Sequence, residues 1–162
     1  MAVYTKLSEN DLKEFFSKYN LGKILNYNEI KEGIENTNYY IRTDKGKFIL
    51  TVYEKRVEEK DLPFFMGLMR NLFDSNFPSP EPIINKNGNY ITEILNKKAA
   101  IVSFLEGTAK KKLDAADCYQ VGIQAAKLHL ITKNLASKRE NKLSVNSWKK
   151  IYQNVQQDCS KI

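Results

Sequence analysis

The stretch of the chain whose residue types best suit ligand binding is the polar loop at residues 32–38 (EGIENTN). Gly33 permits close approach of a ligand to the backbone, and Asn36, Thr37 and Asn38 carry short polar side chains that can hydrogen-bond near it. We therefore expect a ligand to lie against the backbone of this loop. The alternative interpretation is an Asn-rich β-turn that binds nothing.

A hairpin of two strands, preceded by a strand that starts near Tyr27, must position this loop. In each strand alternate residues share one face: Tyr39, Ile41 and Thr43 in the first, and Phe48, Leu50 and Val52 in the second. Residues 44–47 (DKGK) form a short turn with Gly where a positive φ is needed. The spacing thus predicts that residues 27–56 fold as strand, loop, strand, turn and strand.

Two amphipathic helices are expected to cover the hairpin. Ser8 is a good N-cap for a helix over residues 9–19, which carries aromatic and aliphatic side chains at helical spacing. Asp61 is expected to cap a second helix, and Pro63 is tolerated in its first turn. The apolar stripe of this helix is wide enough to pack on a sheet, and its members are Leu62, Phe65, Met66, Met69, Leu72 and Phe73.

Three further strands follow a proline-rich connection. Residues 82–86 and 89–94 flank Asn87-Gly88, the strongest short hairpin signal in the chain. Residues 98–104 form a strand apolar enough to lie centrally in a sheet. With helices and strands in separate runs, the predicted fold class is α+β.

After Gly107 the hydrophobic period becomes helical. Asp114 is expected to cap a helix, on which the residues expected to share one face are Cys118, Val121, Ala125 and Leu128. A last helix contains Trp148, Ile151, Tyr152 and Val155. His129, the only histidine, is interpreted as a structural residue that holds neighbouring backbone rather than as a catalytic group.

Composition and charge narrow the class of protein. The net charge of +7 comes from the last third of the chain. The first 107 residues hold fifteen basic and fifteen acidic residues, whereas residues 108–162 hold eleven basic and four acidic residues. Aromatic residues do not alternate with the basic ones, so we do not expect a nucleic-acid surface.

No apolar run approaches the ~18 residues of a membrane span. The first residues lack a secretory signal, and two cysteines without metal spacing fit reduced thiols, so we expect a cytoplasmic protein.

Several segments in a fixed order point to a family: EGIENTNYYI, KFILTVYEKR, DLPFFMGLM, AAIVSFLEG and AAKLHL. In these segments the sequence resembles the aminoglycoside-phosphotransferase-like kinases and, within them, the bacterial homoserine kinases of that type. The resemblance implies an N-terminal lobe with a five-stranded antiparallel sheet and a helix, a hinge, and a helical C-terminal lobe. It places these parts at residues 1–102, 103–107 and 108–162, with the last lobe incomplete.

The resemblance also assigns roles at an ATP site between the lobes. Residues Gly33, Ile34, Glu35, Asn36, Thr37 and Asn38 would form the loop that covers the phosphates. Ser103, Phe104 and Leu105 would form the hinge, where the Ser103 carbonyl and the Leu105 amide meet the adenine edge. Backbone groups do this work, so the side chains need no special chemistry.

The chain departs from the general kinase pattern at two linked positions. Such kinases place Lys on the third strand and pair it with Glu on the next helix. Here these positions hold Thr51 and a residue near Phe65. The loss of both avoids a buried unpaired charge. Lys55 or Arg56, just beyond the strand, is therefore expected to supply positive charge to the phosphates.

The catalytic loop of these kinases, with its Asp base and magnesium ligands, has no match between Gly107 and Ile162. We therefore interpret the chain as the N-terminal portion of an enzyme that transfers the γ-phosphate of ATP to L-homoserine in threonine biosynthesis. We expect it to be inactive alone, to need Mg²⁺ held by residues outside it, and to be a monomer. The alternatives are a non-catalytic nucleotide-binding module, a kinase for choline or an aminoglycoside, and a basic adaptor for an acidic partner.

Overall fold

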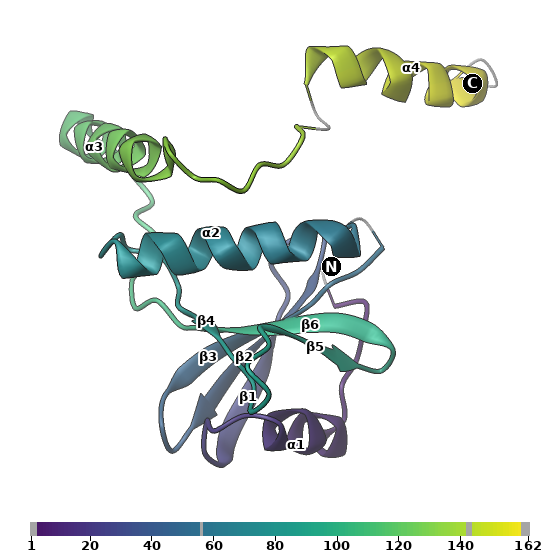
Figure 1. The fold of residues 1–162 in the computed structure, drawn as a ribbon, viewed down its shortest axis with the longest axis vertical. Helices are drawn as coiled ribbons and strands as arrows, with labels where there is room; N and C mark the ends of the chain where they lie inside the picture. Colours follow the sequence, from purple (N-terminus) through teal and green to yellow (C-terminus); the bar gives the residue numbers. More distant parts are fainter. Residues whose placement is uncertain (1–2, 56, 142–143, 160–162) are drawn as a thin grey trace.

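The computed structural model describes residues 3–55, 57–141 and 144–159, and its centre is one sheet with a helix on each side (Figure 1). The elements in chain order are α1 (Glu9–Ser17), β1 (Ile24–Ile30), β2 (Thr37–Thr43), β3 (Lys47–Val52), the 3₁₀ turn η1 (Glu59–Asp61), α2 (Leu62–Asp74), β4 (Pro82–Ile83), β5 (Ile91–Ile94), β6 (Lys97–Ser103), α3 (Ala115–Thr132) and α4 (Val145–Cys159). The predicted α+β class is confirmed.

All strand pairs are antiparallel, in the order β1-β2-β3-β6-β4, and β5 also pairs with β6. The sheet has six strands rather than the five implied by the family resemblance. The additional strand is the two-residue β4, in which Pro82 lies opposite Val102 and Ile83 opposite Ile101. Its shortness keeps this edge of the sheet from offering a long unpaired ladder.

One face of the sheet is buried against α1. Its residues lie at alternate positions of β2, β3 and β6 and include Tyr39, Ile41, Leu50, Val52, Ala99 and Ile101, each at most 1% exposed. The predicted shared faces of the hairpin strands are thus confirmed. The helix contributes Leu12, Phe15 and Phe16 to the same cluster. Each large side chain buried this way stabilises the fold by about 1.5–3 kcal/mol.

The helix α1 begins as predicted but ends two residues early. Ser8 and Asp11 form a reciprocal capping box at its start. At its end the Lys18 amide donates to the carbonyls of Phe15 and Phe16, which closes the last turn at Ser17. Tyr19 lies beyond the helix and still packs on Phe15, at 5.5 Å between ring centroids.

The opposite face of the sheet is only half-buried. Its residues alternate with the core positions and include Asn38, Tyr40, Ile49, Thr51 and Val102. Helix α2 lies on this side (Figure 1) and buries Leu62, Met66 and Leu72. The sheet therefore has one closed face, on α1, and one face that is partly open.

The predicted hairpin around Asn87-Gly88 is wrong. The Asn85 amide donates to the Asn89 carbonyl at 2.8 Å, but no ladder continues from this turn. Instead β4 and β5 lie one after the other along the same edge of β6 and cannot pair with each other. The hairpin is β5–β6, and it turns at Leu95 and Asn96, whose φ values of 47° and 60° are those of a type I′ turn.

Asp61 occupies the N-cap position of α2 without capping it. Its side chain makes no hydrogen bond to the backbone of the first turn. The carboxylate instead accepts a 2.7 Å hydrogen bond from Nε of Arg139, in the segment after α3. The guanidinium of Arg139 also lies over the Phe65 ring, at 5.1 Å. The Asp61 carboxylate thus binds the distant Arg139 guanidinium and does not cap α2 as predicted.

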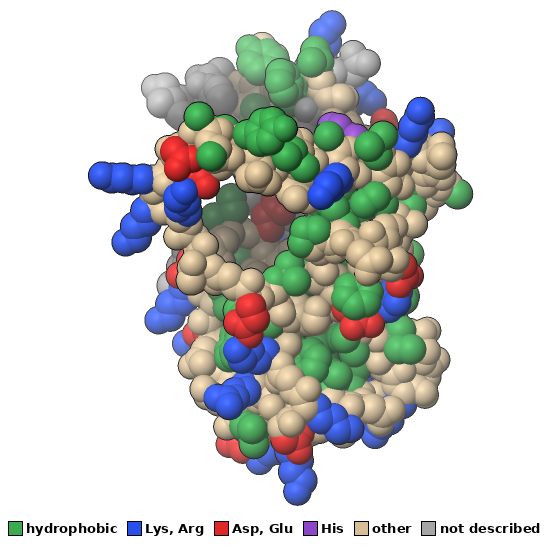
Figure 2. All heavy atoms as spheres, turned by 90° about the vertical axis from the view of Figure 1, so that its left-hand side faces the viewer, with side chains coloured by type: hydrophobic (Ala, Val, Ile, Leu, Met, Phe, Trp, Pro, Cys, Tyr) green, Lys and Arg blue, Asp and Glu red, His purple; other side chains and the backbone are tan. Residues whose placement is uncertain are grey.

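The two C-terminal helices pack loosely. Asp114 caps α3 through a reciprocal box with Asp117, as predicted. No residue of α3 is buried, and Cys118, Val121 and Ala125 of the predicted shared face are exposed. Figure 2 shows apolar side chains on the surface of this upper, helical part, and α4 likewise exposes Trp148, Ile151, Tyr152 and Val155. The division of the chain at residues 103–107 stays a prediction.

Candidate functional site

The loop at residues 31–36 connects β1 to β2 at one end of the sheet. Gly33 has φ 110°, a value that favours glycine, so the residue type matches the backbone here. Gly33, Ile34 and Glu35 are exposed, Asn36 is half-buried, and Thr37 begins β2 with no exposed surface. The part of the loop that could meet a ligand is therefore the backbone of residues 33–35.

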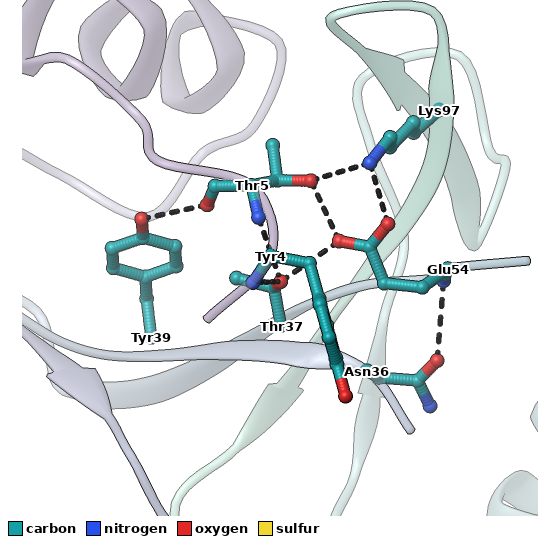
Figure 3. A network of polar contacts seen from close by, with 7 residues as sticks. All are labelled: Tyr4, Thr5, Asn36, Thr37, Tyr39, Glu54 and Lys97. Atoms are coloured by element: carbon teal, nitrogen blue, oxygen red, sulfur yellow. Dashed lines mark hydrogen bonds and ion pairs between the residues drawn. The ribbon is translucent and has the colours of Figure 1, made fainter. Parts of the chain in front are cut away.

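The three short polar side chains at the end of the loop and the start of β2, those of Asn36, Thr37 and Asn38, make hydrogen bonds within the protein. Oδ1 of Asn36 accepts a 3.2 Å hydrogen bond from the Glu54 amide. Thr37 belongs to the buried network drawn in Figure 3. Oδ1 of Asn38 accepts a 2.8 Å hydrogen bond from the Thr51 hydroxyl, across the β2–β3 ladder. These contacts shape the loop, and direct contact of the three side chains with a ligand stays a prediction.

Glu54 is the centre of that network (Figure 3). Its side chain is 9% exposed, and its carboxylate accepts hydrogen bonds from the hydroxyls of Thr5 at 2.6 Å and Thr37 at 2.8 Å, and from Nζ of Lys97 at 2.5 Å. Burial raises the pKa of the Glu54 carboxyl, but the hydrogen bonds from Lys97, Thr5 and Thr37 outweigh it and leave the pKa below its ordinary value. Glu54 is therefore an ionised, buried anchor behind the loop.

The expected hinge lies at the other end of the sheet. The Phe104 amide donates to the Lys47 carbonyl at 3.0 Å, while the Ser103 amide donates to the Glu81 carbonyl at 2.9 Å. The Glu81 amide donates to the Ser103 hydroxyl, at 2.8 Å, rather than to its carbonyl. The Leu105 amide has no hydrogen-bond partner among the described residues, and its side chain is 48% exposed. A backbone donor is thus available at this end.

Strand β3 connects the two ends, because Phe48 lies opposite Ser103 and Val52 lies opposite Thr37. At a rise of ~3.4 Å per residue the ends are about 14 Å apart. Between them runs the half-open face of the sheet, where the rings of Tyr40 and Phe104 form a T-shaped pair with their centroids 5.2 Å apart. Figure 2 shows a hollow between the part of the molecule that carries the sheet and the helical part above it. An elongated ligand could lie along this face.

The positions that differ from the kinase pattern are neutral in the structure. Thr51 is paired with Asn38, and Phe65 on α2 lies beneath Arg139. Lys55 is exposed just beyond β3 and has no hydrogen-bond or ion-pair partner among the described residues. Arg56 lies outside the described residues. The role of Lys55 or Arg56 at a phosphate therefore stays a prediction.

Other chemical groups in the described part of the chain do not form a second site. The described residues contain no group of three or more His, Cys, Asp or Glu side chains that could hold a metal ion. The His129 side chain is exposed and makes no hydrogen bond to other described residues, so the expected backbone-holding role is not seen. Among the helices that the structure describes, none has the length and apolar content needed to cross a bilayer.

The residues that support the loop from behind were not predicted from the sequence as one network; they are Tyr4, Thr5, Tyr39, Glu54 and Lys97. A signal for them was present. Thr37, Glu54 and Lys97 lie one alternation step beyond Tyr39, Val52 and Ala99, which are buried positions of β2, β3 and β6. A polar residue at a core-facing position predicts a buried polar partner. This rule would have placed all three on the same side of the sheet.

The chain is similar to known proteins over most of its length. The model of the phosphotransferase enzyme family matches residues 26–156. The homoserine kinases of Beijerinckia indica and Bartonella tribocorum are each 44% identical over 96% of this chain, and that of Agrobacterium fabrum is 43% identical over 94%. These alignments cover 48%, 49% and 47% of the three relatives. The chain spans about half the length of the curated relatives it matches.

A solved structure has a similar fold. Spectinomycin phosphotransferase, crystallised in complex with ADP and spectinomycin, superposes with a TM-score of 0.60 at 13% sequence identity. The superposition covers 94% of this chain and 47% of that protein. At this identity the likeness supports the fold alone. Because the family model matches most of its length, this chain belongs to the phosphotransferase enzyme family.

Proposed function

We propose that this chain is the nucleotide-binding portion of an ATP-dependent homoserine kinase. The complete enzyme would transfer the γ-phosphate of ATP to the hydroxyl of L-homoserine and release ADP and O-phospho-L-homoserine, a step of threonine biosynthesis. The observation that carries this proposal is the identity of 43–44% to proteins named homoserine kinase, sustained over 94–96% of the chain. The substrate assignment rests on these relatives, since the described residues include no recognisable homoserine site.

The geometry supports ATP as the ligand of the half-open face. The unpartnered Leu105 amide and the carbonyl of Ser103 would meet the adenine edge. The triphosphate would then extend along β3 toward the exposed backbone of residues 33–35, where amide groups can bind phosphate oxygens. The carboxylate of Glu35 would repel a phosphate, so we expect its backbone, not its side chain, to face the ligand. Lys55 or Arg56 would supply compensating positive charge.

Mg²⁺ and the general base are not assigned to this portion of the enzyme. The described residues contain no candidate metal cluster, so no step of the proposal passes through a metal held by them. We propose that the metal ligands and the base that accepts the homoserine proton lie in the part of the relatives that this chain does not span. We further propose that the enzyme is a cytoplasmic monomer that binds only small molecules.

Two measurements test the proposal. Isothermal titration of the chain with ATP should give saturable binding, and absence of binding would contradict a nucleotide site. The chain alone should show no homoserine-dependent release of ADP. A protein that carries this chain and spans the full length of the relatives should release ADP with homoserine, but not with choline or spectinomycin. ATP binding without turnover by that longer protein would instead indicate a non-catalytic nucleotide-binding module.

A further inference from the structure

We propose that the N-terminal strap, residues 4–7, and the Glu54–Lys97 ion pair act as positioning residues for the candidate phosphate loop. They would hold the loop in its ligand-binding shape without touching the nucleotide. This inference rests on the proposed function, because it assigns a purpose to contacts behind the same site. The residues involved come from four separate parts of the chain (Figure 3).

The strap is bound by side chains of β2 through its backbone. The Thr37 hydroxyl accepts hydrogen bonds from the amides of Tyr4 and Thr5, at 2.9 and 3.1 Å. The Tyr39 hydroxyl donates to the Thr5 carbonyl at 2.9 Å and accepts from the Leu7 amide at 3.0 Å. Thr37 and Tyr39 are 0% and 1% exposed. The strap therefore runs in a fixed register along the start of β2.

The protons of this network can be placed. A threonine hydroxyl has one proton to donate. The carboxylate of Glu54 has none, so Thr5 and Thr37 must each donate to it. Their lone pairs are then free to accept, from Nζ of Lys97 at 2.6 Å for Thr5 and from the strap amides for Thr37. A network in which each donor and acceptor has a defined role favours a single geometry.

The network reaches the loop itself at three points. The Tyr4 hydroxyl donates to the Ile34 carbonyl at 2.9 Å. The Glu54 amide donates to Asn36, and Thr37 is the residue at which the loop becomes β2. These contacts use the carbonyl of Ile34 and leave the amides of residues 33–35 without a hydrogen-bond partner among the described residues. They would orient amides toward a phosphate in advance of binding, which is how supporting residues raise affinity.

This arrangement predicts that loss of these contacts weakens binding of the phosphates of a nucleotide and not binding of its adenine. We compare Tyr4→Phe and Thr37→Val, which remove one hydroxyl each, with Thr37→Ser, which keeps it. Tyr119→Phe is the matched control, because Tyr119 is exposed on α3 as Tyr4 is exposed on the strap, at 69% and 58%. Isothermal titration measures the affinities of the chain for ATP, ADP and adenosine. Hydrogen exchange of residues 31–36 is followed in the absence of nucleotide.

We expect Tyr4→Phe and Thr37→Val to weaken ATP and ADP binding by about three- to tenfold, while adenosine binding changes less than about twofold. Thr37→Ser keeps the hydroxyl and should recover most of the affinity that Thr37→Val loses, and Tyr119→Phe should match the wild type. Both hydroxyl-removing variants should exchange faster in the loop.

Equal loss of ATP and adenosine affinity, or unchanged ATP affinity in both variants, would overturn the inference. If Thr37→Val does not fold, Tyr4→Phe decides, since its side chain lies at the surface. If the wild type binds no ATP, the proposed function fails. Hydrogen exchange then tests the role of the strap separately. Wild-type exchange of residues 31–36 in both hydroxyl-removing variants would overturn the inference that the strap holds the loop.

Discussion

The hydroxyl of Thr51 donates a 2.8 Å hydrogen bond to Oδ1 of Asn38, the residue directly opposite it on β2. This neutral pair occupies the strand position where the general kinase pattern has lysine, and Phe65 stands near the helix position of its glutamate. Thr51 and Phe65 are both half-buried, so a lysine or a glutamate at one of these positions without its partner at the other would be destabilising. The pair thus leaves the centre of the half-open face uncharged and places any cation for the phosphates at its margin.

Replacing Thr51 with Val should lower the free energy of unfolding by about 1 kcal/mol, because the Asn38 amide loses its partner on a half-buried face. Thr51→Ser keeps the hydroxyl and should retain most of that stability. A double-mutant cycle with Asn38→Ala, measured by urea unfolding, isolates the pair. A coupling energy near zero would contradict a stabilising role for this hydrogen bond.

Replacing Lys55 with Ala should weaken ATP binding by about 5- to 30-fold if this exposed cation meets the phosphates. Arg56→Ala is made in parallel, since the sequence does not distinguish the two. Lys13→Ala is the control, because Lys13 is exposed on α1 behind the closed face of the sheet. The measurement is isothermal titration with ATP. Wild-type affinity for ATP in both Lys55→Ala and Arg56→Ala would show that neither residue contacts the phosphates.

Leu105→Pro should weaken recognition of adenine, because proline lacks the backbone amide that has no hydrogen-bond partner among the described residues at the hinge. We expect binding of ATP and of adenosine to weaken by about tenfold or more. Leu105→Ala keeps the amide and removes only an exposed side chain, so it should bind as the wild type does. Titration of both nucleotides provides the comparison. If the two variants bind alike, the hinge amide is not the contact.

Acid should destabilise the fold through Glu54. The folded-state pKa of Glu54 lies below its ordinary value of 4.5, so the protein binds this proton less readily than the unfolded chain. The resulting stability is complete above that ordinary value and decreases as pH falls through the lower folded-state pKa. At pH 7, Glu54→Gln should be less stable than the wild type by about 1–3 kcal/mol in the free energy of unfolding. Between about pH 5 and pH 3 the stability of the variant should then decrease less than that of the wild type, because the variant has no carboxylate to protonate at this position.

Urea unfolding at a series of pH values measures this difference. Glu9→Gln is the matched control, since Glu9 also has a lowered pKa, through its hydrogen bond with Lys13, but lies at the surface. Its stability should stay close to that of the wild type at each pH. Parallel curves for Glu54→Gln and the wild type would show that Glu54 does not control the acid response.

Arg139→Ala should loosen the first turn of α2, because Asp61 and Phe65 both lose their contact with the guanidinium. We expect a cost of about 1 kcal/mol in the local opening free energy, reported by faster hydrogen exchange in residues 62–66. Arg139→Lys keeps the charge but not the planar group and should recover only part of the protection. Exchange equal to the wild type in both variants would show that the contact does not stabilise the turn.

The sequence was most informative where one local pattern determines the structure. Alternation placed Tyr39, Ile41, Leu50 and Val52 on the core face because strand side chains point to opposite faces in turn. Capping chemistry located the starts of α1 and α3, since a side-chain cap acts within one turn. The resemblance to a family then supplied the antiparallel sheet, which such local patterns leave open, but neither its strand order nor its sixth strand.

The errors fall where distant partners compete with local signals. Asn87-Gly88 suits a two-residue hairpin, but β6 takes both neighbouring segments along one edge. Asp61 suits an N-cap, but its carboxylate is closer to Arg139, 78 residues away. The network around Glu54 combines residues from four segments, so no single window of sequence contains it. Such choices depend on tertiary contacts, which a one-dimensional pattern does not encode.

The N-terminal strap also constrains the order in which the chain can fold. Thr5 contacts Lys97, which lies 92 residues later, and the ends of such a loop must meet before that contact can form. A growing chain therefore exposes the strap early and completes its partners only after β6 has been synthesised. Folding of the candidate phosphate loop should be a late event that depends on contacts of high sequence separation. A substitution that delays the docking of β6 would therefore slow maturation of the phosphate loop, although Lys97 of β6 contacts residues behind that loop.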